Sequence, residues 1–186
     1  MPNGNRPRIC VYCASRLGTD PGFTVAARDA GRAIVGHGAD LVFGGGGVGL
    51  MGVVTDAVLD GGGHVIGVTP EALVDDEFPH PRIQDLRIVG DVTERKRVMF
   101  TEADAFLTLP GGIGTMEEMF EMLSWAYLGV HRRPMGLLAV GDYFDHLVAF
   151  LDHSVQVGLT KSAARDLLVV DDDVERLVGK LLAQRV

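Results

Sequence analysis

Short continuous apolar runs alternate along the chain with longer stretches in which apolar residues recur at helical spacing. Strands are predicted at 8–14, 40–43, 64–69, 86–89, 105–109, 135–140 and 167–170. Helices are predicted at 23–36, at about 53–58, and at 92–102, 116–128, 143–157 and 171–182. Near-continuous apolar strands separated by helices are typical of a parallel sheet covered by helices on both faces. We therefore predict a three-layer α/β fold with a doubly wound parallel sheet.

The remaining segments complete the predicted organisation. Residues 1–7 are polar and predict a flexible tail, which leaves 8–186 as one domain. Residues 70–82 contain three prolines and predict a loop or lid without regular structure. Asp171 precedes the last apolar stretch and is predicted to cap the final helix.

The stretch L-T-L-P-G-G-I-G-T-M-E-E at 107–118 predicts a strand, a glycine turn and the start of a helix. Gly111, Gly112 and Gly114 permit backbone angles that a side chain would forbid, and free N–H groups at a helix start attract anions. Glu117 and Glu118 follow in the first helical turn. They either complement the helix dipole or act as an acid or base beside a bound phosphate, and their adjacency to an anion loop favours the second interpretation.

Another glycine turn, the first of the two in chain order, is G-G-G-G-V-G-L-M-G at 44–52, which contains the G-x-G-x-x-G pattern more than once. No acidic residue follows about twenty positions later to hold a ribose hydroxyl, which weakens a dinucleotide interpretation. The motif alone is equally compatible with a tight packing turn. In a doubly wound sheet, however, both glycine turns lie at the carboxyl ends of strands, where ligands bind.

Charged, apolar and sulfur-containing residues indicate which ligands and which cellular location fit the sequence. Arg95 lies on an apolar helical stripe and needs a carboxylate or an anionic ligand as partner. A net charge of −8 argues against a nucleic-acid groove. No segment has the length and apolar content of a membrane span, so a cytoplasmic protein is predicted. Cys10 and Cys13 are interpreted as reduced packing residues on opposite faces of the first strand.

The chain resembles the LOG ("lonely guy") family of cytokinin riboside 5′-monophosphate phosphoribohydrolases, formerly often labelled lysine decarboxylases. The resemblance runs from about Ile9 to the C-terminal helix. It rests on F-G-G-G-G-V-G-L-M-G at 43–52, V-I-G-V-T-P at 65–70, E-R-K at 94–96, P-G-G-I-G-T-M-E-E at 110–118, and L-G-V-H at 128–131 with Pro134. Two departures concern the preferred base rather than the reaction. Val92-Thr93 replaces the family's Met-His, and S-W-A-Y-L-G at 124–129 replaces T-W-x-Q-L-G.

The resemblance implies a Rossmann-like sheet and a homodimer with sites near the subunit interface. It also implies hydrolysis of the N-glycosidic bond of purine nucleoside 5′-monophosphates, often N6-substituted, without a metal or other cofactor. The family's catalytic residues correspond to Arg95 and the pair Glu117 and Glu118. The predicted substrate-binding residues are Ser15, Gly45, Gly46, Met51, Glu77, Lys96, Gly111, Gly112, Gly114 and Thr115. For Ser15 a capping role is equally compatible with the sequence, whereas for Glu77 the residues themselves favour a solvated loop position.

The sequence argues against the older decarboxylase label and leaves two alternatives open: a carrier, and a purely structural or interaction protein, which would leave Arg95 and the glutamates without a common ligand. A decarboxylase would require a lysine that carries pyridoxal phosphate, and the chain has only Lys96, Lys161 and Lys180, none in a suitable context. A non-catalytic carrier of a nucleotide or of molybdenum cofactor would use the same architecture.

Overall fold

Seven parallel strands form one sheet in the computed structural model, which describes residues 6–83 and 85–185 except the side chains of Asp76 and Glu77. The strands are β1 (Arg8–Tyr12), β2 (Asp40–Phe43), β3 (Val65–Pro70), β4 (Asp85–Val89), β5 (Ala105–Thr108), β6 (Met135–Leu138) and β7 (Leu168–Asp171). Their order across the sheet is β4-β3-β2-β1-β5-β6-β7. The chain therefore reverses its direction of travel between β1 and β5, and the predicted doubly wound parallel sheet is confirmed.

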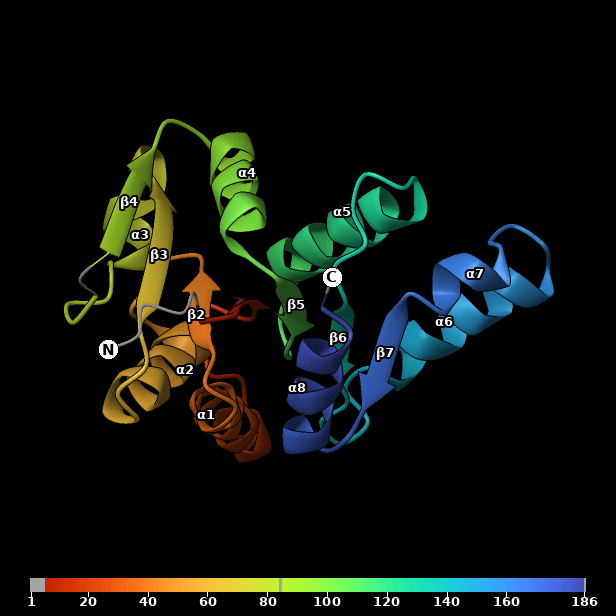
Figure 1. The fold of residues 1–186 in the computed structure, drawn as a ribbon, viewed down its shortest axis with the longest axis horizontal. Helices are drawn as coiled ribbons and strands as arrows, with labels where there is room; N and C mark the ends of the chain where they lie inside the picture. The colour runs from red at the N-terminus through yellow and green to blue at the C-terminus, as the bar shows by residue number, and fades with distance from the viewer. Residues whose placement is uncertain (1–5, 84, 186) are drawn as a thin grey trace.

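Helices cover both faces of this sheet (Figure 1). The main helices are α1 (Pro21–Gly36), α2 (Gly49–Asp60), α4 (Val92–Glu102), α5 (Ile113–Tyr127), α6 (Asp145–Gln156), α7 (Ser162–Arg165) and α8 (Val174–Ala183). Side chains of α1, α2 and α8 share one apolar core, and those of α4, α5 and α6 share the other. Cys13 belongs to the first core and Cys10 to the second, as the strand alternation predicted, and both are buried free thiols.

Three details of the prediction are corrected by the structure. The segment predicted to be irregular contains the short 3-10 helix η1 (Glu71–Leu73) and α3 (Val74–Glu77), because its prolines flank these turns rather than interrupt them. The cap of α8 is Asp173, whose side chain accepts a hydrogen bond from the N–H of Arg176 at 2.9 Å. Asp171 instead ends β7, where its buried carboxylate pairs with Arg176 and Lys180.

The end of the predicted tail contacts the loop before β2, and the helices of the described residues are too short or too polar to cross a membrane. The first five residues of the predicted tail lie outside the described part of the chain, whereas Arg6 donates from Nε to the carbonyl oxygen of Gly38 at 3.0 Å. Of the helices in the described residues, none combines the length and the apolar character that crossing a membrane requires.

Candidate active site

A cavity of about 890 Å³ lies at the carboxyl ends of β1 and β5, at the point where the sheet reverses direction. Its walls come from the loop after β1, the first glycine turn, the starts of α4 and α5, and the turn before α6. Open α/β sheets bind ligands at this position. Most of the predicted site residues line the cavity: Ser15, Met51, Arg95, Lys96, Gly111, Gly112, Gly114, Thr115, Glu117 and Glu118.

The second glycine turn forms an anion cradle at the start of α5. Gly112 is the N-cap of this helix and supplies no side-chain hydrogen bond, so the first N–H groups of α5 remain available to a ligand. A Cβ added at Gly112 or at Gly114 would meet no atom within 4 Å, which leaves both positions open toward the cavity. A Cβ at Gly111 would lie 2.1 Å from Oγ1 of Thr115, so a side chain there would displace Thr115.

The first glycine turn has a different role, because two N–H groups at the start of α2 donate to protein. The N–H groups of Leu50 and Met51 donate to the carbonyl oxygen of Ala14 at 3.0 and 3.3 Å, which closes the start of α2. Gly49 has φ of +61°, and a Cβ there would lie 2.2 Å from the carbonyl carbon of Ser15. The close approach of two loops therefore explains this glycine, and the packing interpretation of the turn applies.

Two predicted binding residues of that turn do not line the cavity. Gly45 has φ of +86°, and a Cβ there would lie 2.0 Å from Oγ1 of Thr69. Gly46 forms an isolated bridge with Pro79. Gly44 of the same turn does line the cavity, whereas Gly45 contacts β3 and Gly46 contacts the segment after α3.

Two hydrogen bonds between carboxylates and backbone N–H groups fix the start of α4 and so determine where Arg95 projects. Asp91 accepts a hydrogen bond from the N–H of Glu94, and the carboxylate of Glu94 accepts one from the N–H of Gly90, each at 2.8 Å. One turn into the helix, Nη2 of Arg95 donates to the carbonyl oxygen of Gly44 at 2.8 Å. This contact holds the guanidinium, half-buried, in the wall of the cavity.

The two adjacent glutamates lie in different surroundings. Glu117 is exposed and pairs with the ammonium group of Lys96, which also lies 3.1 Å from Oε1 of Glu121. Burial by itself would lower the pKa of Lys96, but the hydrogen bonds to both glutamates outweigh it and raise that pKa. Glu118 is half-buried. Burial raises the pKa of the Cys13 thiol and the charge of Glu118 raises it further, which locates this carboxylate near the end of β1.

One further side chain, that of Tyr143, lies at the cavity and contacts the cradle. Tyr143 was not predicted, yet it lines the cavity and its hydroxyl donates to the carbonyl oxygen of Gly111 at 2.6 Å. No local pattern could have identified it, because the partner lies 32 residues earlier. Glu77 ends α3, and its side chain lies outside the described part of the molecule.

Comparisons with known proteins find similar sequences over most of the chain. Residues 51–181 match the family model described as "Possible lysine decarboxylase". A probable cytokinin riboside 5′-monophosphate phosphoribohydrolase of Oryza sativa subsp. japonica is 46% identical over 93% of this chain and 75% of its own length. A cytokinin riboside 5′-monophosphate phosphoribohydrolase of Arabidopsis thaliana is 44% identical over 94% of this chain and 81% of its own length.

Solved structures show the same fold at lower identity. The molybdenum cofactor carrier protein of Chlamydomonas reinhardtii superposes with a TM-score of 0.72 at 20% identity, covering 97% of this chain and 98% of its own. At this identity the likeness concerns the arrangement of helices and strands.

Proposed function

The chain belongs to the LOG family of phosphoribohydrolases, and on this basis we propose that it hydrolyses the N-glycosidic bond of purine nucleoside 5′-monophosphates. The products are the free base and ribose 5-phosphate. One observation carries the proposal: an anion cradle and a half-buried carboxylate at the start of α5 line a single cavity together with a guanidinium from α4. A nucleoside monophosphate offers a charged group for each of these during cleavage.

The phosphate binds at the start of α5, where the N–H groups of 112–115 and the positive end of the helix face it. Glu118 stabilises the positive charge that develops on the sugar and directs a water molecule to C1′. The water oxygen bonds to C1′ as the C1′–N9 bond breaks, and the bonding pair leaves with the base. The carboxylate accepts the proton that the water releases and later gives it up to solvent, while the purine anion takes up a proton from solvent to become the free base.

Arg95 stabilises the negative charge that gathers on the leaving purine. Its guanidinium remains protonated at neutral pH, so this help is electrostatic rather than a proton transfer. The hydrogen bond to the carbonyl oxygen of Gly44 holds the group in place before substrate arrives. Glu117 is exposed and pairs with Lys96, whereas Glu118 is half-buried near Cys13 at the end of β1, and this deeper position supports Glu118 as the acting member of the pair.

The apolar part of the lining supports a purine as the base. Met51, Leu73 and Val92 border the cavity, and Val92 is 54% exposed although it is apolar. A flat base, with or without an apolar N6 substituent, buries these side chains on binding. Their burial lowers the free energy of the complex in proportion to the apolar area removed from water.

The residues present do not fit pyridoxal phosphate, which the description of the family model as a lysine decarboxylase would imply. A lysine that carries this cofactor must have a free amine. The ammonium group of Lys96 is held by Glu117 and Glu121, and its pKa is raised. Lys180 pairs with Asp171 at 2.8 Å, and Lys161 is exposed before α7, outside the cavity.

We further propose a cytoplasmic homodimer. Most of the apolar residues on α5 contact the core of their own chain, but Leu128 and Val130, directly after the helix, are 70% and 62% exposed. Burial of these side chains by a second copy supports the dimer. The two buried free thiols support a reducing compartment. Light scattering should give twice the monomer mass of 19.9 kDa, and a monomer at micromolar concentration contradicts the dimer.

The proposed reaction is tested by incubating the protein with AMP and with isopentenyladenosine monophosphate. Release of free base together with ribose 5-phosphate supports it. Tight nucleotide binding by calorimetry without turnover would contradict the reaction and favour a carrier. Specificity constants for AMP, GMP, CMP and N6-substituted AMP then identify the preferred base.

A further inference from the structure

The turn before α6 contributes one aromatic side chain to the cavity, and its hydroxyl is directed at the anion cradle. Tyr143 donates from its hydroxyl to the carbonyl oxygen of Gly111 at 2.6 Å. The two residues come from different strand–helix connections, after β6 and after β5. This hydrogen bond therefore ties the cradle to a neighbouring part of the sheet edge.

The contact controls the direction of one cradle donor. In a trans peptide, the carbonyl of Gly111 and the N–H of Gly112 point in opposite directions. A hydrogen bond that holds the carbonyl toward Tyr143 thereby fixes the N–H of Gly112 on the other side of the peptide plane. Gly112 has no Cβ to restrict this peptide, so an external hydrogen bond is the available restraint.

Aromatic packing holds the tyrosine ring in position. The ring of Phe23 on α1 meets it edge to face at 5.2 Å between centroids, and Phe144 meets it in the same manner at 4.8 Å. Phe23 in turn lies against Gly18, where a Cβ would come within 2.8 Å of Cδ2 of Phe23. Gly18 also has φ of +75°, which a glycine adopts without strain. A continuous set of contacts thus connects the loop after β1 to the cradle.

We propose that Tyr143 is a positioning residue for phosphate binding, which pre-orients the Gly111–Gly112 peptide of the cradle through its hydroxyl. The inference rests on the proposed function, because that function supplies the phosphate. The hydroxyl proton is committed to the carbonyl oxygen of Gly111, so Tyr143 acts through the backbone and not by donating to the ligand.

The direct test is Tyr143→Phe, which keeps the ring and its contacts with Phe23 and Phe144 but removes the donor. Binding of ribose 5-phosphate, measured by calorimetry, should weaken about fivefold, the equivalent of one neutral hydrogen bond. Binding of adenosine, which lacks the phosphate, should stay unchanged. In turnover, KM for AMP should rise about fivefold while kcat changes less than twofold.

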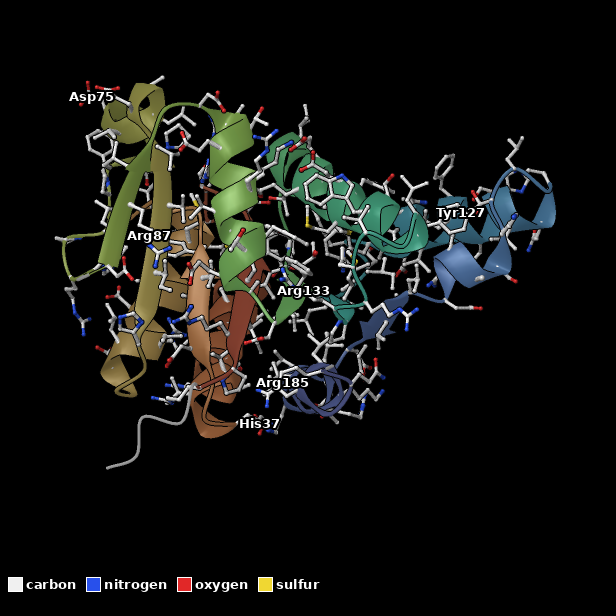
Figure 2. All side chains as sticks on the ribbon, turned by 45° about the horizontal axis from the view of Figure 1, so that its top comes forward. His37, Asp75, Arg87, Tyr127, Arg133 and Arg185 are labelled. Atoms are coloured by element: carbon white, nitrogen blue, oxygen red, sulfur yellow. The ribbon has the colours of Figure 1, made fainter. Side chains whose placement is uncertain are left out.

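The matched control is Tyr127→Phe. Tyr127 lies at the end of α5 that is remote from α4, and it does not line the cavity (Figure 2). Removing the hydroxyl of Tyr127 should change the binding affinity of neither ribose 5-phosphate nor adenosine. Equal weakening of adenosine and ribose 5-phosphate by Tyr143→Phe would show a general loss of site structure and overturn the proposal.

A measurement on the ligand-free protein separates positioning from direct contact. Loss of a hydrogen bond at the carbonyl of Gly111 should shift the amide ¹⁵N resonance of Gly112 in Tyr143→Phe but not in Tyr127→Phe. An unshifted resonance would overturn the positioning role. This readout does not depend on turnover, so the failure of the proposed reaction would be distinguished from the failure of this inference.

Discussion

Nη2 of Arg95 donates to the carbonyl oxygen of Gly44 at 2.8 Å, across 51 residues of sequence. The same approach leaves no room for a side chain at Gly44, because a Cβ there would lie 1.8 Å from that nitrogen. The position of the guanidinium thus depends on the absence of one methyl group. Gly44 has an ordinary backbone φ, so the requirement for glycine is steric.

Gly44→Ala should therefore move Arg95 without unfolding the protein, since the flexible end of the arginine can shift away. Turnover of AMP should fall about 100-fold, the usual effect of displacing one charge-stabilising group. Gly36→Ala at the end of α1 is the control, because a Cβ there meets no atom within 4 Å. Full activity of Gly44→Ala would show that the position of Arg95 does not matter to the reaction.

The two glutamates should differ in their effect on kcat when each is changed to glutamine. Glu118→Gln preserves shape but removes the charge beside the sugar, and kcat should fall about 100-fold or more with ribose 5-phosphate binding retained. Glu117→Gln should keep most turnover, because this carboxylate pairs with Lys96. Steady-state kinetics on both variants decides the assignment. An inactive Glu117→Gln beside a merely weakened Glu118→Gln would reverse it.

Gly112→Val should affect binding before chemistry. A Cβ at this position meets no protein atom within 4 Å, so the variant should fold. The valine side chain should then occupy the space that the phosphate takes in the wild type. KM for AMP should rise about tenfold, equivalent to ~1.4 kcal/mol, with kcat changed much less. Competition by adenosine should be unaffected. A collapse of kcat at unchanged KM would indicate that the phosphate binds elsewhere.

His131 should make the stability of the fold depend on pH. Its Nδ1 accepts the N–H of Arg133 at 3.1 Å and its Nε2 lies 3.0 Å from the carbonyl oxygen of Met122, so the ring is neutral. Burial lowers its pKa, and the contact with Met122 offsets this only partly. The unfolded chain therefore binds the proton more readily, and stability falls as the pH drops from about 6.5 toward the folded pKa.

Melting temperatures between pH 7.5 and pH 5 measure this effect. His131→Gln should reduce the fall in melting temperature on acidification, because the buried titrating group is gone. His146→Gln, at an exposed position on α6, should retain the wild-type profile. If the melting temperatures of wild type and His131→Gln fall in parallel with pH, His131 is not the cause of the pH dependence.

Much of the fold is predictable because its determinants are local. Apolar runs and helical spacing located all seven strands and every helix of ten or more residues but not the four-residue α7, since side-chain periodicity follows directly from backbone geometry and needs several turns to show. Where the prediction was wrong, competing local signals were present. Prolines in 70–82 suggested irregular structure but only flank the short helices there, and Asp171 and Asp173 both offered a capping carboxylate.

The sequence by itself determined the sheet, the two glycine turns and the charged residues that follow them, because each depends on neighbours within a few positions. Only the tertiary structure decided how those turns are used. The carbonyl of Ala14 closes the start of α2, while the start of α5 remains open to the cavity. Likewise, contacts across 21 and 32 residues pair Glu117 with Lys96 and Tyr143 with Gly111. Such pairs depend on how separate elements pack together, and that packing cannot be inferred from residue spacing along the chain.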